Sequence, residues 1–568
     1  MAVPKPKASA QESASLPWFA RHPAWLLALL TVLALLPFAG KPFNIDDPLF
    51  VWTAQHIRTH PLDPYGFNVN WYGYDWPMAA TTQNPPLASY FLAMVGGIFG
   101  WGEFALHTAF LLPAIAAIVG TYRLAARLCK WPFLAAFLAL FTPVFLVSST
   151  TLMCDVMMLA FWVWALIFWM EGTERKRAWY FALAAILIAL ASLTKYFGAC
   201  LLPLVVVWSL WRKQPARQWL GWLAIPVLAL VAYQLATKAL YGHGLLTTAG
   251  AYATAIHKSS ILLNLNSVLV ALTFTGGCLA TAAFFAPMLW PRRGLLIGTI
   301  GSLAIAAILF FAIRGTFPDQ PGAAEIAQIL FWAAGGISLI ALAIADFYRR
   351  RDADSLLLGC WMLGTFVFTA FFNWTVNGRS ILPMAIPAAI LVVRRLEQRE
   401  SAGVQFSWRL LLVPTVAGAV LAIWATTADY FFASASPVAA RAVQSAHGDK
   451  GHRIWFEGHW GFQYYMQQNG ATALDLHKLA ITEGDYIAVP SGNSNVYPLK
   501  EPIVELETFS IPPSGSLTTM NADAGAGFYA SLWGPLPFAF GPNSGQSVTV
   551  FGYDPTGELL KGATEKKP

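Results

Sequence analysis

Long apolar stretches, about thirteen in number, constrain this chain most. An α-helix needs roughly 20 mainly apolar residues to cross a bilayer. Apolar residues make up 57% of the 568 positions and charged residues only 11%, against roughly 25% charged residues in soluble domains. We therefore predict a mainly α, polytopic membrane protein. The expected spans are residues 23–40, 104–128, 132–148, 151–170, 178–194, 197–211, 218–240, 264–290, 294–313, 325–347, 355–372, 380–396 and 408–428.

Small groups of Lys and Arg alternate between the loops and predict the orientation. They include residues 123–130, 175–177, 212–217, 292–293, 349–351 and 394–399, and such groups mark cytoplasmic loops. We expect a cytoplasmic tail over 1–22, a membrane domain over 23–430 and an outer tail over 431–568. Because the basic groups recur between spans, the pI of about 9.1 does not indicate nucleic-acid binding.

The ends of the first outer loop give two further expectations. FAGKPF follows the first span and is a poor signal-peptide cleavage site, so the span is read as an uncleaved anchor. PPLASYFLAMVGGIFG at 85–100 is short and starts with two prolines, which favours an interfacial or re-entrant helix. The first outer loop, with its interfacial helices, then covers residues 41–103.

Two adjacent carboxylates, Asp46 and Asp47, lie just after the first span in FNIDDPLF. A carboxylate at the outer mouth of a membrane helix can take a proton from a substrate hydroxyl. The alternative is that the pair only marks where the helix leaves the lipid. Two adjacent aspartates could also hold a divalent cation, but oxygen sites need more ligands than the sequence supplies. A metal is therefore left open and not predicted.

Three more ionisable residues are expected at the same face. Asp155 lies near the outer start of the fourth span, and a carboxylate there is costly unless it faces a cavity or a cation. Lys195 lies in the turn between the fifth and sixth spans, and Arg379 at the outer start of the twelfth. Both are candidate ligands of a phosphate. The alternatives are an Asp155–Lys195 ion pair and cations that contact lipid headgroups.

Aromatic residues are dense in the first outer loop and include Tyr74. Aromatics at a membrane boundary usually anchor the protein in the interface, although their rings also stack on sugars. Because aromatic rings stack on sugars, Tyr74 is a candidate substrate contact.

Four elements together resemble the GT-C glycosyltransferases, in particular the group with the protein O-mannosyltransferases and the aminoarabinose transferases that modify lipid A. They are FNIDDPLF, NPPLASYFLA at 84–93, Asp155, and NGRSILPMAIPAAIL at 377–391. The resemblance covers about residues 23–400.

The resemblance implies a polyprenyl-phosphate sugar as donor, a hydroxyl acceptor in the cell envelope, transfer at the non-cytoplasmic face and inversion at the anomeric carbon. Asp46 or Asp47 would be the general base, with Asp47 slightly preferred. Lys195 and Arg379 would bind the donor phosphate, and Asp155, Asn84 and Pro85 the substrate. A Glu-Lys pair precedes PPL in the aminoarabinose transferases, but Gln83-Asn84 stands here, which favours a neutral sugar or another acceptor.

The tail beyond 430 changes character and predicts a small α/β or α+β domain. RIWFEG, DYIAVPS, PIVELETFSI and SVTVFGYD resemble strands, and HWGFQYYMQQNG a helix. Its cluster of Glu457, His459, Trp460, Tyr464 and Tyr465 is expected to pack in a core, with acceptor contact as the alternative.

Two other classes of function stay open. A transporter or flippase of lipid-linked saccharides would show internal repeats and broken helices near mid-membrane, and neither is evident. A non-catalytic scaffold would tolerate loss of the aspartates. The five cysteines lie in or beside spans without CxxC spacing, so no disulfide framework or zinc site is expected. The expected location is the plasma or inner membrane of a bacterium.

Overall fold

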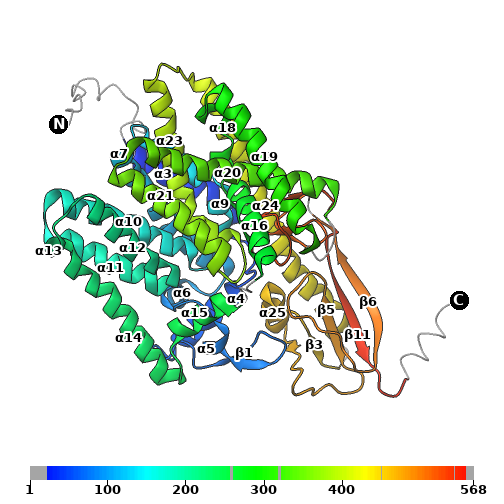
Figure 1. Cartoon of the computed structure of the whole chain (residues 1–568). Helices are drawn as coiled ribbons and strands as arrows, with labels where there is room; N and C mark the ends of the chain where they lie inside the picture. Colours follow the sequence, from blue (N-terminus) through cyan, green and yellow to red (C-terminus); the bar gives the residue numbers. More distant parts are fainter. Residues whose placement is uncertain are drawn as a thin grey trace.

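A computed structural model gives the arrangement of residues 22–255, 260–316, 321–448, 451–513, 515–542 and 544–557. The predicted cytoplasmic tail, residues 1–22, lies outside this range except for its last residue. A body of long helices carries, at one end, a smaller region with the strands β3, β5, β6 and β11 (Figure 1). The expected mainly α fold with a small strand-containing C-terminal part is confirmed.

Eight helices of the described residues are long and apolar enough to cross a membrane, or nine if the bent pair α8 (Pro132–Leu140) and α9 (Pro143–Ser149) counts as one span. The chain is thus an integral membrane protein. The eight are α7 (Glu103–Leu128), α10 (Asp155–Arg175), α13 to α14 (Ala216–Tyr241), α16 (Ile261–Cys278), α19 (Arg292–Ile313), α20 (Ala323–Arg350), α21 with η5 (Ala353–Phe372) and α24 (Trp408–His447).

Three other expected spans form apolar helices of only 10–17 residues. These apolar helices are α3 with η1 (Pro23–Phe38), α11 (Ala178–Thr194) and η2 with α12 (Tyr196–Trp211). The proposed interfacial segment forms α6 (Leu87–Phe99). The total of thirteen spans stays a prediction.

The segment 380–396 differs from the expectation of a simple span. It contains α22 (Gly378–Ile381), η6 (Leu382–Met384) and α23 (Ala385–Ser401), and α23 is buried along nearly its whole length. Arg394 in α23 is almost inaccessible and pairs with Asp346 of α20 at 3.2 Å. Other helices therefore surround α23, and an ion pair within the protein compensates its charge.

The first outer loop folds into short helices and strands. They are α4 (Asp47–Ile57), β1 (Asn68–Asn70), β2 (Asp75–Pro77) and α5 (Met78–Thr81). Farther along the chain, α15 (Leu245–Ala255) lies between α14 and α16, while α17 (Ala280–Ala283) and α18 (Ala286–Leu289) connect α16 to α19.

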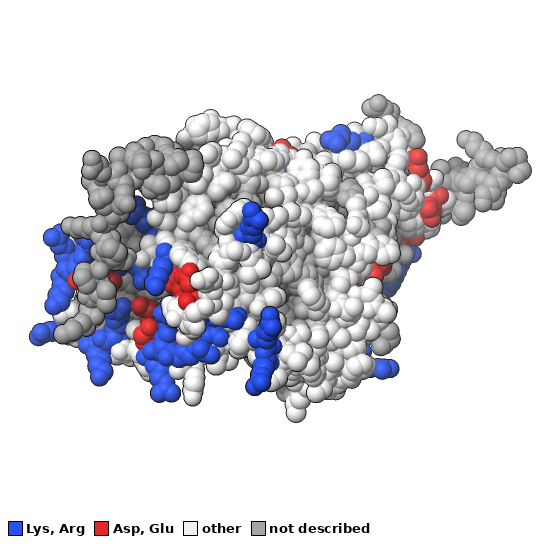
Figure 2. All heavy atoms as spheres, turned by 90° about the horizontal axis from the view of Figure 1, so that it is seen from above, with Lys and Arg blue, Asp and Glu red and all other residues white. Residues whose placement is uncertain are grey.

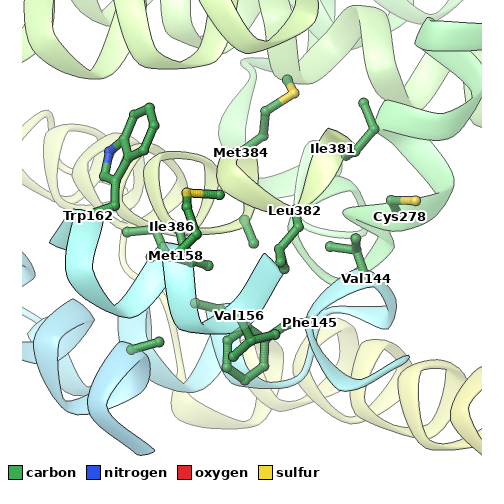
Figure 3. Close-up of a cluster of buried hydrophobic side chains, with 14 of the residues drawn as sticks. Val144, Phe145, Val156, Met158, Trp162, Cys278, Ile381, Leu382, Met384 and Ile386 are labelled. Carbon is green, nitrogen blue, oxygen red and sulfur yellow. The ribbon is translucent and has the colours of Figure 1, made fainter. Parts of the chain in front are cut away.

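A continuous apolar core joins the membrane helices. Figure 3 shows part of it, where Leu382 of η6 lies between α10, which carries Met158 and Trp162, and α9, which carries Val144. The ring of Trp162 stacks on Trp361 of α21, with centroids 5.5 Å apart. This packing fixes the starts of α10 and α22, which carry Asp155 and Arg379.

The C-terminal region is built on a mixed five-stranded sheet in the order β4-β3-β5-β11-β6. The predicted strands and helix are present as β3 (Ile454–Phe456), α25 (Trp460–Gln468), β5 (Tyr486–Pro490), β6 (Ile503–Ile511) and β11 (Gln546–Tyr553). The sheet also has β4 (Thr472–Ala473), and two small pairs in this region are β7 (Leu517–Thr518) with β10 (Ala539–Phe540) and β8 (Met520–Asn521) with β9 (Ala526–Gly527). α24 runs on to His447, so the helix does not end at the predicted boundary of 430.

In the view from above in Figure 2, basic side chains gather at the left and along the lower edge of the molecule. Among the basic groups predicted to be cytoplasmic, Arg127 pairs with Glu171 and Glu174, and Arg212 pairs with Asp354. This gathering agrees with the orientation predicted from the loops.

Candidate active site

A cavity of about 590 Å³ opens between the first outer loop, the membrane helices and the C-terminal region. Its charged lining residues are Asp46, Lys195 and Arg379. The membrane domain adds apolar and aromatic lining, and the C-terminal region adds a neutral wall. The cavity therefore brings together parts of the chain that are far apart in sequence.

Arg379 is the centre of an ion network in this cavity. Its Nη1 lies 2.7 Å from Asp46 Oδ2, and its Nε lies 2.8 Å from Asp155 Oδ2. The other oxygen of Asp155 pairs with Lys195 Nζ. Four of the residues predicted from the sequence thus form one chain of contacts, and the alternative reading of Asp155 as an ion-pair partner of Lys195 is confirmed.

Local structure positions each member of this network. Asn377 caps α22 by accepting a hydrogen bond from the backbone N–H of Ser380 at 2.8 Å, which orients the turn that carries Arg379. Asp155 is in the first turn of α10, where a carboxylate is favoured by the helix dipole. Lys195 follows the last residue of α11.

The two neighbouring aspartates have different environments. The side chain of Asp46 is 31% exposed and lines the cavity. Asp47 is fully buried, and its two oxygens accept backbone N–H bonds from Leu152 at 2.8 Å and Asn44 at 3.2 Å. Burial raises the pKa of Asp47 to about 7, although Lys41 and the two backbone donors lower it. Asp47 thus fastens the first loop to the segment before α10.

Of the three remaining predicted substrate contacts, one lines the cavity and two do not. Asn84 lines the cavity, and its backbone carbonyl accepts a hydrogen bond of 2.8 Å from Tyr65 Oη. Pro85 and Tyr74 are not among the lining residues. Tyr74 instead stacks on His477 of the C-terminal region, with ring centroids 4.3 Å apart. The structure thus places Tyr74 at a contact between regions and not in the cavity.

The C-terminal region takes a part in the site that sequence analysis gave only as the alternative for the cluster with Trp460. Its lining residues are Trp460, Ser494, Asn495, Met520, Tyr529, Ala530, Leu532 and Trp533. Core packing was expected for the cluster 457–465, and Tyr464 does pack against Phe43. Trp460, however, lines the cavity. In the sequence, Trp460 only follows Gly458 and His459, and that position does not indicate that its side chain lines a cavity.

A second buried network, which sequence analysis missed, joins the regions behind the cavity. Lys41 and Asp429, both completely inaccessible, form an ion pair. Asp429 also accepts hydrogen bonds from Thr519 at 3.0 Å and from Tyr529 at 2.8 Å. Because Tyr529 lines the cavity, this network holds part of its wall against α24.

Among the residues that the structure describes, no group of three or more His, Cys, Asp or Glu side chains could hold a metal ion. Both oxygens of Asp155 already contact cations.

Residues 83–241 match a protein-family model described as dolichyl-phosphate-mannose-protein mannosyltransferase. This segment is similar to that family. The resemblance predicted from the sequence is thereby confirmed for the part of the chain that includes Asn84, Asp155 and Lys195. Asp46 and Arg379 lie outside the matched segment.

Solved structures also show distant likeness. The oligosaccharyltransferase AglB from Archaeoglobus fulgidus, in complex with an inhibitory peptide and a dolichol-phosphate, is 13% identical with a TM-score of 0.47, covering 83% of this chain and 70% of its own. ArnT from Cupriavidus metallidurans in the apo state is 13% identical with a TM-score of 0.43, covering 83% and 93%. The same protein bound to undecaprenyl phosphate is 14% identical with a TM-score of 0.40, covering 82% and 92%. No curated protein matches the chain.

Proposed function

We propose that this protein is a membrane glycosyltransferase that moves a sugar from a polyprenyl-phosphate donor to an acceptor hydroxyl at the non-cytoplasmic face. The observation that carries the proposal is the network of Asp46, Arg379, Asp155 and Lys195 at one cavity. It supplies a carboxylate for the acceptor proton and two cations for a leaving phosphate. The match of residues 83–241 to a mannosyltransferase family supports the same reaction class.

Arg379 and Lys195 are the proposed ligands of the donor phosphate. A guanidinium binds phosphate oxygens through two parallel N–H bonds, and Arg379 is nine-tenths buried, where such bonds are strong. Asp155 is only 1% exposed and would keep both cations in place. Asp46 is the more exposed partner, so an incoming phosphate would replace it at Nη1 of Arg379.

Asp46 is the proposed general base, in preference to Asp47. Once the phosphate takes its place on Arg379, Asp46 is free to accept the proton of the acceptor hydroxyl. The acceptor oxygen then bonds to the anomeric carbon while the bond from that carbon to the phosphate oxygen breaks. The electron pair leaves with polyprenyl phosphate, and this single displacement inverts the anomeric centre. A positioned base contributes roughly 10²–10⁴ in rate.

The side of the cavity formed by membrane helices suits an isoprenoid chain. Phe197 and Cys200 of η2, Leu246 of α15 and Phe368 of η5 line it. Phe197 and Cys200 belong to η2 (Tyr196–Cys200), which begins directly after Lys195, so a lipid along this side could reach the cavity with its phosphate toward the cations.

The first test measures binding of undecaprenyl phosphate to protein in lipid nanodiscs by the rise in unfolding temperature. Arg379→Gln should weaken binding at least about tenfold, because it removes the bidentate phosphate contact. Arg314→Gln, which removes a cation from an exposed outer position, should leave binding unchanged. Equal loss in both variants, or no stabilisation of the native protein, would contradict the proposed phosphate site.

Catalysis is tested separately with radiolabelled polyprenyl-phosphate hexoses and cell-envelope acceptors. A transferase releases polyprenyl phosphate and labels an acceptor. A transporter or flippase moves the intact donor across a vesicle membrane without release. Movement without release would refute the proposal.

A further inference from the structure

The C-terminal wall of the cavity differs in chemistry from the membrane-domain side. All three charged lining residues, Asp46, Lys195 and Arg379, belong to the membrane domain. The residues that the C-terminal region contributes are aromatic, apolar, hydroxyl or amide groups, and none is charged. A ligand that rests on this wall is therefore recognised without ion pairs.

Two tryptophans are the largest groups on this wall. The rings of Trp460 and Trp533 lie 5.4 Å apart at 56° to each other. Within the described ranges, neither indole N–H has a hydrogen-bond partner, and the hydroxyl of Ser494 has none. Trp533 is half-buried, so part of it faces the cavity. The wall thus combines aromatic surface with unused neutral polar groups, a combination that suits a ring bearing hydroxyls.

Trp460 also adopts an unusual backbone conformation, with φ of 61°. Bulky residues seldom occupy this region, and strained residues concentrate at ligand sites. Gly461 follows, and a Cβ there would lie 2.2 Å from the carbonyl oxygen of Phe43. The close approach allowed by Gly461 places the start of α25 directly against the segment that leads to Asp46.

Hydrogen bonds hold the wall close to the first loop, which carries Asp46, and to the turn that carries Arg379. The N–H of Phe43 donates to Tyr465 Oη at 2.9 Å, which ties α25 to the first loop. On the other side, the N–H of Gly378 donates to the carbonyl of Phe528 at 2.7 Å, and the N–H of Ser531 to that of Val376 at 2.8 Å. The segment before Trp533 is thereby tied to the turn that carries Arg379.

We infer that this wall is the acceptor subsite and that the acceptor is a neutral saccharide, with Trp533 as its main ring contact. A sugar ring against Trp533 and Ser494 would present a hydroxyl toward the part of the cavity where Asp46 and Arg379 lie. The inference rests on the proposed transferase function, for which the sequence leaves proteins, lipids and glycans open as acceptors. A peptide is the rival that the test below is able to reveal.

The test uses photoreactive probes on the full-length protein in nanodiscs. Neutral trisaccharides of glucose, mannose and galactose, each carrying a diazirine, are cross-linked, and the labelled residues are mapped by mass spectrometry. At least one probe should label residues near Trp460 or Trp533. Its unlabelled trisaccharide should compete, whereas a Ser/Thr-rich peptide and glycerol phosphate should not.

Trp533→Ala should reduce this labelling about tenfold, as expected for loss of one aromatic contact, and Trp533→Phe should restore most of it. Trp76→Ala is the matched control, because Trp76 is 42% exposed on the first loop and does not line the cavity. Trp533→Ala should still bind undecaprenyl phosphate, which shows that it is folded.

Three results would overturn the inference. They are no labelling by any of the three sugars, equal labelling of the Trp533→Ala and Trp76→Ala variants, and displacement of the label by the peptide. Failure of the proposed function gives a different result, because the native protein would then neither bind undecaprenyl phosphate nor release it from a donor, whatever the probes label.

Discussion

Replacing Asp155 by Asn should destabilise the protein far more than replacing Asp46 by Asn, although both carboxylates pair with Arg379. Asp155 is only 1% exposed and contacts two cations. Removing one partner of a buried ion pair typically costs about 3–5 kcal/mol. Asp46 is 31% exposed, and pairs of that kind contribute about 1 kcal/mol or less.

A double-mutant cycle between Asp155 and Lys195 gives the magnitude of the coupling. Lys195 is partly exposed and its ion pair is with Asp155, so Lys195→Met alone leaves Asp155 with only Arg379. In the double variant Asp155→Asn/Lys195→Met, no unpaired charge remains at this contact. The double variant should therefore lose about 1–3 kcal/mol less than the sum of the single losses.

The assay is unfolding in mixed lipid–SDS micelles, followed by tryptophan fluorescence for the native chain, the two single variants, the double variant and Asp46→Asn. Additive losses within about 0.5 kcal/mol would show that Asp155 and Lys195 are not coupled. A loss for Asp46→Asn as large as that for Asp155→Asn would also refute the assigned roles.

Three further predictions concern other parts of the chain. Lys41→Met should destabilise the protein by about 3–5 kcal/mol because it leaves Asp429 buried without its cation. Lys41→Met/Asp429→Asn should recover part of that loss in the same assay, because the amide removes the buried charge and keeps an oxygen that accepts from Thr519 or Tyr529. Asp47→Asn should cost about 1–3 kcal/mol in stability, since its amide cannot accept both backbone bonds, yet undecaprenyl phosphate should still bind with its native Kd. Burial raises the pKa of Glu457 to about 7. The contribution of this side chain to stability is therefore fully present below about pH 4.5, and it is lost as the pH rises through 7. Glu457→Gln should therefore remove about 1–2 kcal/mol of the native decline in stability between pH 5 and 8, and an equal decline in both proteins would contradict this.

Much of the fold could be predicted because it depends on local pattern. Apolar stretches located the long helices, and alternation with turn residues located β3, β5, β6 and β11. The segment 380–396 was harder, because a helix surrounded by other helices has the same apolar composition as one that faces lipid. Tertiary contacts show why its charges are tolerated, since Arg394 pairs with Asp346 and Arg395 donates to the carbonyl of Leu289.

The candidate site was predicted in its charges but not in their arrangement. Asp46, Asp155, Lys195 and Arg379 stood out because ionisable groups are rare in such a chain. The choice between Asp46 and Asp47 depends on which side chain the first turn of α4 directs toward Leu152, and neighbouring positions on a helix face different directions. For Trp460 the sequence offered acceptor contact only as an alternative, and the pairing of Trp460 with Trp533 was not predictable, because it exists only where distant segments meet.

The most direct test of the central claim is release of polyprenyl phosphate from a radiolabelled polyprenyl-phosphate sugar by the native protein, Asp46→Asn and Asp47→Asn in equal folded amounts in nanodiscs. We expect Asp46→Asn to bind undecaprenyl phosphate but to release product at least about 10²-fold more slowly, while Asp47→Asn keeps most of the native rate. Native release by Asp46→Asn, with the rate lost only in Asp47→Asn, would contradict this account and make the buried aspartate the base.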